Sequence, residues 1–286
     1  MGTPNVGLPD RRTLYPVPAV SAVTRLSVNL NKVALLRNAR GGGRPDPLTH
    51  AALCLDAGAA GLTLHPRPDG RHARADDVLA LAAFAAGRGA EMNVEGNPFE
   101  GPGRTGGYAF PGFVELVREA RPAQATLVPD AVGQLTSDHG WAVGPDGAFR
   151  DAARLASVIV ELQGAGCRVS LFVDADARAV RAAAGVGADR VELYTGPFAH
   201  AFARGDAGAA LGACAEAAEA ARAAGIGLNA GHDLDLANLG PFLAAVAGVD
   251  EVSIGQALVA DALERGMADT VAAYVAICTT SGSVEG

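Results

Sequence analysis

Residues 166–195 read GCRVSLFVDADARAVRAAAGVGADRVELYT and decide the fold. The runs 167–174 and 190–195 are rich in Val, Leu and aromatic residues, which is typical of buried strands. The Ala-rich segment 176–187 between them has helical length, and its final Gly187 suits a left-handed helix cap. Two strands joined by a helix within so short a stretch predict neighbouring parallel strands.

The same alternation extends from Arg25 to residue 278. Further glycines follow the helical segments, at Gly58, Gly87, Gly166 and Gly225, where we expect left-handed caps. The predicted strands are Arg25–Asn31, Gly61–His65, Glu91–Glu95, Ala125–Pro129, Cys167–Asp174, Arg190–Thr195, Gly227–Ala230 and Asp250–Ile254. The predicted helices cover 47–58, 75–87, 111–120, 149–165, 176–187, 207–224, 238–246 and 257–278.

Eight such strand–helix units are the number that closes a (β/α)₈ TIM barrel, an α/β fold. An open doubly wound sheet could use the same alternation, but no G-x-G-x-x-G follows the first strand. The longer insertions 96–110, 130–148 and 196–206 all follow strands. We therefore expect extra loops and short helices on the C-terminal face of the barrel, where active-site loops gather.

Composition bounds the organisation and the partners. A chain of 286 residues suits one barrel domain at 25–280, with an N-terminal arm at 1–24 and a tail at 281–286. The net charge of −8 disfavours nucleic-acid binding. The chain has no apolar run of membrane-spanning length, its Pro-broken start is a poor signal peptide, and its four cysteines form no close pair. We expect a cytoplasmic protein with no membrane partner.

Alternation along the strands predicts which side chains face the barrel axis. In the first two strands, Leu and Val residues take the outward positions, which leaves Ser27, Asn29, Asn31, Thr63 and His65 facing inward. Barrel interiors are usually filled by branched aliphatic residues, so polar side chains there need a partner or a ligand. The same register gives inward positions to Glu91, Asn93, Glu95, Glu192, Tyr194 and Ser253.

Three titratable residues fall at the strand ends that form the barrel mouth. His65 and Glu95 end the second and third strands, and His232 follows the seventh. Histidine exchanges protons near neutral pH, and a desolvated Glu can be tuned into the same range. Each residue alone would more simply be a structural polar group. Their common register and common end of the barrel favour a multi-step proton-transfer site.

A metal site is the main alternative to this acid–base interpretation, and the loops after the last strands also indicate a phosphate site. Metal-dependent barrel hydrolases open with His-x-His at the first strand end, where this chain has Asn29-Leu-Asn31, so we expect no metal. Phosphate sites in barrels use backbone N–H groups after strands seven and eight. The candidate phosphate donors are Gly231–Asp233, Gly255, Gln256, Arg40, Arg67 and His72.

An ordered set of motifs resembles the pyridoxine 5′-phosphate synthase family from about residue 25 to 278. The motifs are RNAR at 37–40, GLTLHPR at 61–67, RH at 71–72, MNVE at 92–95, LVP at 127–129, SLFVD at 170–174, VELYTG at 191–196 and NAGH at 229–232. The resemblance implies a cofactor-free transferase of vitamin B6 biosynthesis, acting by acid–base catalysis. It would condense 1-deoxy-D-xylulose 5-phosphate with 3-amino-2-oxopropyl phosphate into pyridoxine 5′-phosphate, phosphate and water. It also implies a homo-oligomer, typically an octamer.

The resemblance assigns roles by position. His65 and Glu95 match the family's proton acceptors, His232 its proton donor, and Glu192 the carboxylate that stabilises the transition state. Contacts to the amino-ketone phosphate match Asn29, Arg40, Asp233, Gly255 and Gln256, while contacts to the deoxyxylulose phosphate match Asn31, Lys32, Arg67, His72 and Thr136.

The chain departs from many family members in its substrate contacts. It has Asn31-Lys32 where many have Asp-His, Asp233 where many have Gly, and Gln256 where many have His. Two other functions stay open from the residues. One is a different phosphosugar isomerase, epimerase or aldolase on the same barrel, although Lys32 is the one lysine placed to form a Schiff base. The other is a non-catalytic relative that binds a phosphorylated ligand.

Overall fold

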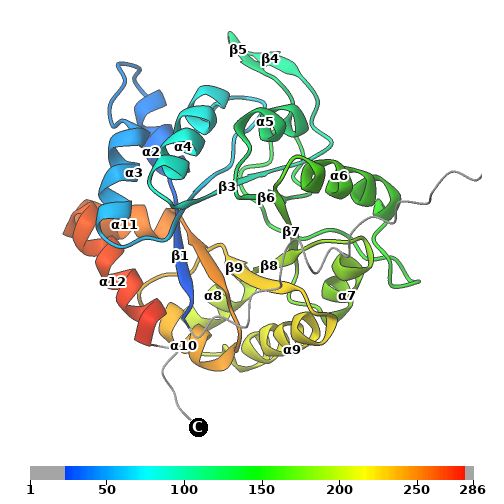
Figure 1. Ribbon diagram of the computed structural model, residues 1–286. Coiled ribbons are helices and arrows are strands. Elements are labelled where there is room, and N and C mark those ends of the chain that lie inside the picture. The colour runs from blue at the N-terminus through cyan, green and yellow to red at the C-terminus, as the bar shows by residue number, and fades with distance from the viewer. Residues whose placement is uncertain (1–22, 281–286) are drawn as a thin grey trace, which may run out of the picture.

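The first and last barrel strands lie side by side. Val28 in β1 (Arg25–Asn29) pairs with Leu62 in β2 (Gly61–Leu64) on one side and with Ile254 in β10 (Glu251–Ile254) on the other. The computed structural model describes residues 23–280. Within them the parallel strands close in the order β1-β10-β9-β8-β7-β6-β3-β2 (Figure 1), which confirms the predicted (β/α)₈ barrel. The remaining barrel strands are β3 (Glu91–Gly96), β6 (Gln124–Leu127), β7 (Arg168–Val173), β8 (Arg190–Tyr194) and β9 (Gly227–Gly231).

Helices form a ring around the strands (Figure 1). Those expected from the sequence are α3 (Pro47–Asp56), α4 (Ala75–Gly87), α5 (Phe113–Ala120), α6 (Ala152–Gly164), α7 (Ala177–Gly185), α9 (Gly208–Ala224) and α10 (Leu239–Ala245). The single helix expected at 257–278 is instead two, α11 (Gln256–Arg265) and α12 (Met267–Thr280). Gly266, with φ +85°, separates them because its backbone leaves the helical region.

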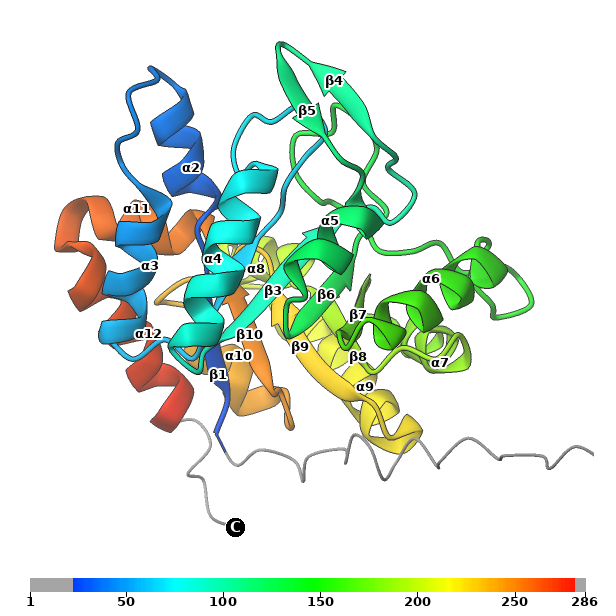
Figure 2. The same ribbon diagram turned by 45° about the horizontal axis from the view of Figure 1, so that its top comes forward.

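Three elements on the C-terminal side of the barrel were not resolved by the sequence pattern. They are α2 (Asn31–Asn38), α8 (Gly196–Ala203) and a hairpin of β4 (Gly103–Thr105) with β5 (Tyr108–Phe110). Figure 2 shows α2 and the hairpin standing beyond the strand ends. The hairpin and α8 lie within the predicted insertions 96–110 and 196–206, whereas α2 follows the first strand outside the predicted insertions.

The predicted side-chain register is confirmed. The outward residues Val28, Leu62 and Val94 are fully buried against the helices. Facing the axis, the hydroxyls of Ser27 and Thr63 lie 2.7 Å apart, so they form a hydrogen bond inside the barrel. These two polar side chains therefore partner each other, as their burial requires.

Charged residues close the N-terminal end of the barrel interior. Arg25 donates to Glu91 at 2.5 Å, and Arg168 also pairs with Glu91. Arg190 donates to Asn229 Oδ1 at 2.8 Å, and the Asn229 amide donates to Glu251 at 3.3 Å. The network satisfies these buried groups at the end of the barrel opposite the predicted site.

The helix caps follow the predicted glycines with one exception. Gly58, Gly166, Gly187 and Gly225 have φ between +68° and +102°, the left-handed region that favours glycine. Gly87 is instead the last residue of α4, and the left-handed residue is Gly89, at φ +66°. The prediction at Gly87 was wrong because α4 turns through Arg88 before the chain reverses.

The structure describes only part of the two predicted chain ends. The expected arm at 1–24 lies outside the described residues except for Val23 and Thr24, and the tail at 281–286 lies outside them entirely. Thr24 Oγ1 donates to the Val249 carbonyl at 2.9 Å.

Among residues 23–280, no helix has the length and apolarity to span a membrane. The four cysteines are free and buried.

Candidate active site

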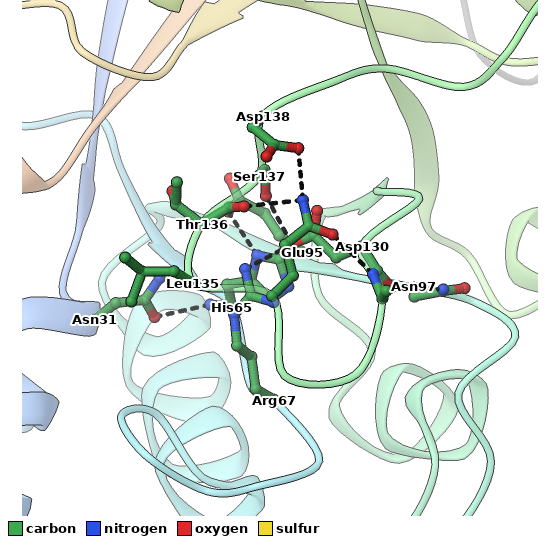
Figure 3. Close-up of polar contacts among 12 residues, drawn as sticks. Asn31, His65, Arg67, Glu95, Asn97, Asp130, Leu135, Thr136, Ser137 and Asp138 are labelled. Atoms are coloured by element: carbon green, nitrogen blue, oxygen red, sulfur yellow. Dashed lines mark hydrogen bonds and ion pairs between the residues drawn. The ribbon is translucent and has the colours of Figure 1, made fainter.

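His65 and Glu95 face each other at the barrel mouth, and both are buried (Figure 3). His65 follows β2, and Glu95 lies near the end of the adjacent β3. The His65 Nδ1 atom is 3.7 Å from Glu95 Oε2. The backbone N–H of His65 donates to Asn31 Oδ1 at 2.9 Å, which fixes the histidine backbone against the start of α2.

Burial moves the two pKa values in directions that suit proton exchange. Desolvation, with the nearby positive charge of Arg67, holds the pKa of His65 well below its usual value, so the imidazole is neutral at pH 7. Desolvation, followed by the Asp130 carboxylate, raises the pKa of Glu95 to about 8. A neutral imidazole thus lies beside a carboxyl that titrates in the physiological range, as acid–base catalysis requires.

Asp130 joins this pair, although the sequence analysis did not single it out. Its Oδ2 accepts from Arg67 Nη2 at 2.5 Å and from Ser137 Oγ at 2.8 Å, and it lies 3.7 Å from His65 Nε2. The Asn97 amide donates to its backbone carbonyl at 2.9 Å (Figure 3). Its place directly after the LVP motif at a strand end was a signal, because acidic residues at strand ends face the mouth.

His232 lies across the mouth at the end of β9. Its Nε2 is 2.6 Å from Thr136 Oγ1, so the loop after β6 reaches over to it. On the other side of the ring, Asp233 Oδ2 lies 3.0 Å from Nδ1. The ring of Tyr194 approaches it edge-on, with centroids 5.3 Å apart. The loops after β6 and β9 and the end of β8 therefore meet at this imidazole.

Glu192 points into the barrel from β8 and is buried. Desolvation, with Glu95 and Glu251 nearby, raises its pKa well above the usual value, which favours the protonated form. Its Oε2 has no hydrogen-bond partner within residues 23–280. A Cβ atom on Gly231 would lie 2.3 Å from Glu192 Oε1, so glycine at this position makes room for the carboxyl group.

The start of α11 forms the side of the mouth predicted to bind phosphate. Gly255 precedes the helix, which begins at the exposed Gln256. Gly255 packs against Asn29, and a Cβ added to it would lie 3.0 Å from Asn29 Cβ. The first N–H groups of a helix lack intrahelical partners and favour anions. Asn29 and Gly255 thus lie together beside a suitable anion site.

A second group of basic side chains lies around the loop after β2. His72 is buried, and desolvation with the charges of Arg67, Arg71 and Lys32 lowers its pKa to about 3. Its Nδ1 accepts from the Ala73 N–H at 2.9 Å. The histidine is therefore neutral at pH 7, and the positive charge around it comes from the arginines and Lys32.

A pocket beside His65 opens between the loops that follow β2, β3 and β6. It is lined in part by Arg67, Asn97, Phe113 and Asp130. Arg71 spans two of these loops by donating to the backbone carbonyl of Gln134 at 2.5 Å. The loop that carries Thr136 is thus tied to both sides of the mouth.

Two features of the predicted site are placed differently from expectation. Asn31 was expected to face inward at the end of the first strand, but the strand ends at Asn29 and Asn31 begins α2. Asn31 Oδ1 accepts a hydrogen bond from the backbone N–H of His65. Arg40 is exposed and follows the end of α2, which rises beyond the strand ends (Figure 2), so it is not brought to the His65–Glu95 pair. No group of three or more His, Cys, Asp or Glu within residues 23–280 is arranged to hold a metal ion.

Comparison with known proteins identifies relatives along almost the whole chain. Residues 26–280 match the family model described as pyridoxal phosphate biosynthesis protein PdxJ. A pyridoxine 5′-phosphate synthase of Xanthomonas axonopodis pv. citri is 56% identical over 254 residues, covering 89% of this chain and 96% of that protein. The corresponding protein of Xylella fastidiosa is 50% identical over 258 residues, covering 90% and 96%.

Solved structures show similarity of fold alone. A thiamine phosphate pyrophosphorylase from Pyrococcus furiosus has a TM-score of 0.55 at 10% identity, covering 91% of this chain and 96% of that chain. Tryptophan synthase from Mycobacterium tuberculosis has a TM-score of 0.58 at 14% identity, covering 92% and 98%. At such identities the similarity supports the barrel and carries no argument about activity.

Proposed function

Since the chain belongs to the PdxJ family of pyridoxal phosphate biosynthesis proteins, we propose that it makes pyridoxine 5′-phosphate in vitamin B6 biosynthesis. The reaction condenses 1-deoxy-D-xylulose 5-phosphate with 3-amino-2-oxopropyl phosphate and releases phosphate and water. Schiff-base formation, elimination and ring closure each move protons at neighbouring carbon and oxygen atoms. Several positioned acid–base groups serve such a sequence better than one nucleophile does.

The observation that carries the proposal is the His65–Glu95 pair. Its 3.7 Å separation and its opposed pKa shifts place a neutral base beside a carboxyl that can hold or release a proton near pH 8. We assign His65 and Glu95 as proton acceptors. Each takes a proton from the substrate as the new bonds form, and the buried position excludes competing water.

The remaining catalytic roles fall to His232 and Glu192. His232 gives a proton to a departing oxygen, and the contact of its Nε2 with Thr136, a residue assigned to substrate binding, supports this role. Glu192, held protonated by burial, acts as a hydrogen-bond donor to negative charge that develops on the substrate. The unpartnered Oε2 of Glu192 supports this role.

The two phosphates take two different groups of residues at the mouth. We assign Asn29, Arg40, Gly255, Gln256 and the backbone at Asp233 to the amino-ketone phosphate, and the helix start at Gln256 supports that assignment. We assign Asn31, Lys32, Arg67, His72 and Thr136 to the deoxyxylulose phosphate. The positive charges around His72 support the assignment of the second group to the deoxyxylulose phosphate.

We further propose a cytoplasmic homo-oligomer, with an octamer as the assembly, that needs no added metal or cofactor and takes small phosphorylated substrates. The family resemblance supports the assembly. Light scattering of the purified chain measures its mass, and a monomer at assay concentration contradicts this proposal.

The function is tested by incubating the purified chain with both phosphorylated substrates in a chelating buffer. Mass spectrometry and phosphate release then follow the products. Pyridoxine 5′-phosphate formed with one equivalent of additional phosphate supports the condensation. Conversion of either substrate alone indicates an isomerase or epimerase instead. An adduct on Lys32 trapped by borohydride indicates an aldolase, and binding without turnover indicates a non-catalytic relative.

A further inference from the structure

We propose that Asp233 is a positioning residue for His232: its carboxylate keeps Nδ1 of the imidazole protonated, so that the ring exchanges protons with substrate through Nε2. The family resemblance offered residue 233 only as a phosphate contact, and many members have glycine there. The consequence for turnover rests on the proposed function, whereas the state of the imidazole is a property of the chain itself.

The backbone at these two residues is strained and firmly held. His232 has φ +80° and Asp233 has φ +60°, a region that costs free energy for residues with a side chain. The Thr195 hydroxyl donates to the His232 carbonyl at 2.5 Å, and the Asn238 amide donates to the Asp233 carbonyl at 3.1 Å. This held conformation turns the two neighbouring side chains toward each other.

The two ring nitrogens of His232 have different surroundings. Nε2 lies 2.6 Å from Thr136 Oγ1, in the loop after β6. Nδ1 is buried and lies 3.0 Å from Asp233 Oδ2, although the carboxylate is off the direction of an N–H bond, so the contact is electrostatic. A carboxylate beside one ring nitrogen favours a proton on that nitrogen. The neutral ring then accepts through Nε2.

Asp233 stays ionised under the conditions in which it would act. Contact with His232 is the largest influence on Asp233 and lowers its pKa, against a smaller opposing effect of partial burial. Tyr194 faces the ring edge-on, His200 lies near Asp233, and Asp138 and Asp174 lie near Tyr194. Among the described residues, Asp233 is the acid in ion-pair contact with the ring.

This arrangement suits a residue that donates protons repeatedly. A donor must regain its proton after each turnover, and an adjacent carboxylate stabilises the imidazolium form. It also keeps Nδ1 turned toward Asp233, which leaves Nε2 on the side of the mouth. The strain at residues 232 and 233 is therefore explained by the orientation that it produces.

Three variants separate charge from orientation. Asp233→Asn tolerates the left-handed backbone and keeps an acceptor oxygen but loses the charge. Asp233→Gly fits the backbone and loses both the charge and the acceptor oxygen. Asp235→Asn is the matched control, because it makes the same charge change two residues away. Its side-chain oxygen can still accept from the N–H groups of Ala237 and Asn238.

The first measurement is the side-chain ¹H–¹⁵N spectrum of the full chain, with His232→Asn used to assign the resonance. We expect the neutral ring to carry its proton on Nδ1 in the unsubstituted chain and in Asp235→Asn, and to lose part of this preference in Asp233→Asn, which lacks the charge. We expect a population with the proton on Nε2 to appear in Asp233→Gly. An unchanged tautomer in Asp233→Gly overturns the proposal.

The second measurement is the pH profile of kcat. In both Asp233 variants the alkaline limb of this profile should be displaced, because the charge that faces Nδ1 is lost. We expect kcat to fall on the order of tenfold in Asp233→Gly, part of the contribution of a positioned acid–base group. An unmoved limb in both variants also overturns the proposal. If the unsubstituted chain forms no pyridoxine 5′-phosphate, the proposed function fails, while the nitrogen spectra still decide the role of Asp233.

Discussion

The imidazole of His65 lies between two carboxyl groups, with Nδ1 3.7 Å from Glu95 and Nε2 3.7 Å from Asp130. The three side chains come from the ends of three neighbouring barrel strands, so the relationship depends on the order of β2, β3 and β6 in the sheet (Figure 3). Burial keeps the histidine neutral and favours the protonated form of Glu95. The pair is therefore poised for proton transfer without carrying opposite charges at rest.

The raised pKa of Glu95 predicts a pH-dependent effect on stability. The folded state holds this proton up to about pH 8, whereas an unfolded Glu releases it near its usual pKa of 4.5. Glu95 therefore stabilises the fold fully below the unfolded pKa, and this contribution is lost as pH rises toward the folded pKa. The free energy of unfolding of the unsubstituted chain, minus that of Glu95→Gln, should fall from pH 5 to pH 8 in urea titrations. A difference that stays constant over this range contradicts the shift.

Asp130→Asn should weaken both substrate binding and the tuning of Glu95. The substitution removes the charge that pairs with the buried Arg67 and that helps to raise the pKa of Glu95. We expect a higher KM for deoxyxylulose phosphate and a rising limb of the kcat profile displaced to lower pH. Loss of one charge-assisted hydrogen bond should cost roughly 1–3 kcal/mol of stability.

The matched control for Asp130→Asn is Asp138→Asn in the same loop. The Asp138 side chain is 60% exposed and accepts only from the amide of Gln134 among the described residues. The Asp138→Asn substitution should leave KM and the pH profile close to those of the unsubstituted chain. Equal effects of the two substitutions would show that loop charge, and not the contacts of Asp130, is responsible.

Gly231→Ala should displace Glu192. A Cβ at this position would lie 2.3 Å from Glu192 Oε1 and 3.2 Å from the Ser253 carbonyl, so the carboxyl group has to move. We expect kcat to fall on the order of 10-fold or more, since a positioned group is lost from the transition state. Gly212→Ala in α9 is the control, because its new Cβ meets nothing within 4 Å. Steady-state kinetics that show the same kcat for both variants would contradict the role given to Glu192.

The sequence predicted side-chain direction well in the strands, where the apolar residues alternate regularly and are buried. Alternation placed His65, Glu95 and Glu192 on the inward face because a slip of one residue would expose every Leu and Val of those strands. Strand limits were less certain, since Asn31 continues the same alternation yet begins a helix. The motifs carried the family and its activity, which the comparisons confirm.

Contacts between loops could not be read from the pattern. The roles of Asp130 and Asp233 depend on where the loops after β6 and β9 place them, and loops carry no periodicity. The contact of Thr136 with His232 joins residues 96 positions apart in the chain. The backbone strain at His232 and Asp233 likewise has no signal in composition, because neither residue is glycine.

In the proposed function, acid–base residues at the barrel mouth carry out the condensation. Its most direct test is the rate of pyridoxine 5′-phosphate formation by the unsubstituted chain and by Glu95→Gln, measured side by side after circular dichroism has shown both to be folded. We predict metal-independent product formation by the first and a rate lower by about 10²-fold or more for the second. No product from the folded unsubstituted chain, or equal rates for the two proteins, would contradict the claim.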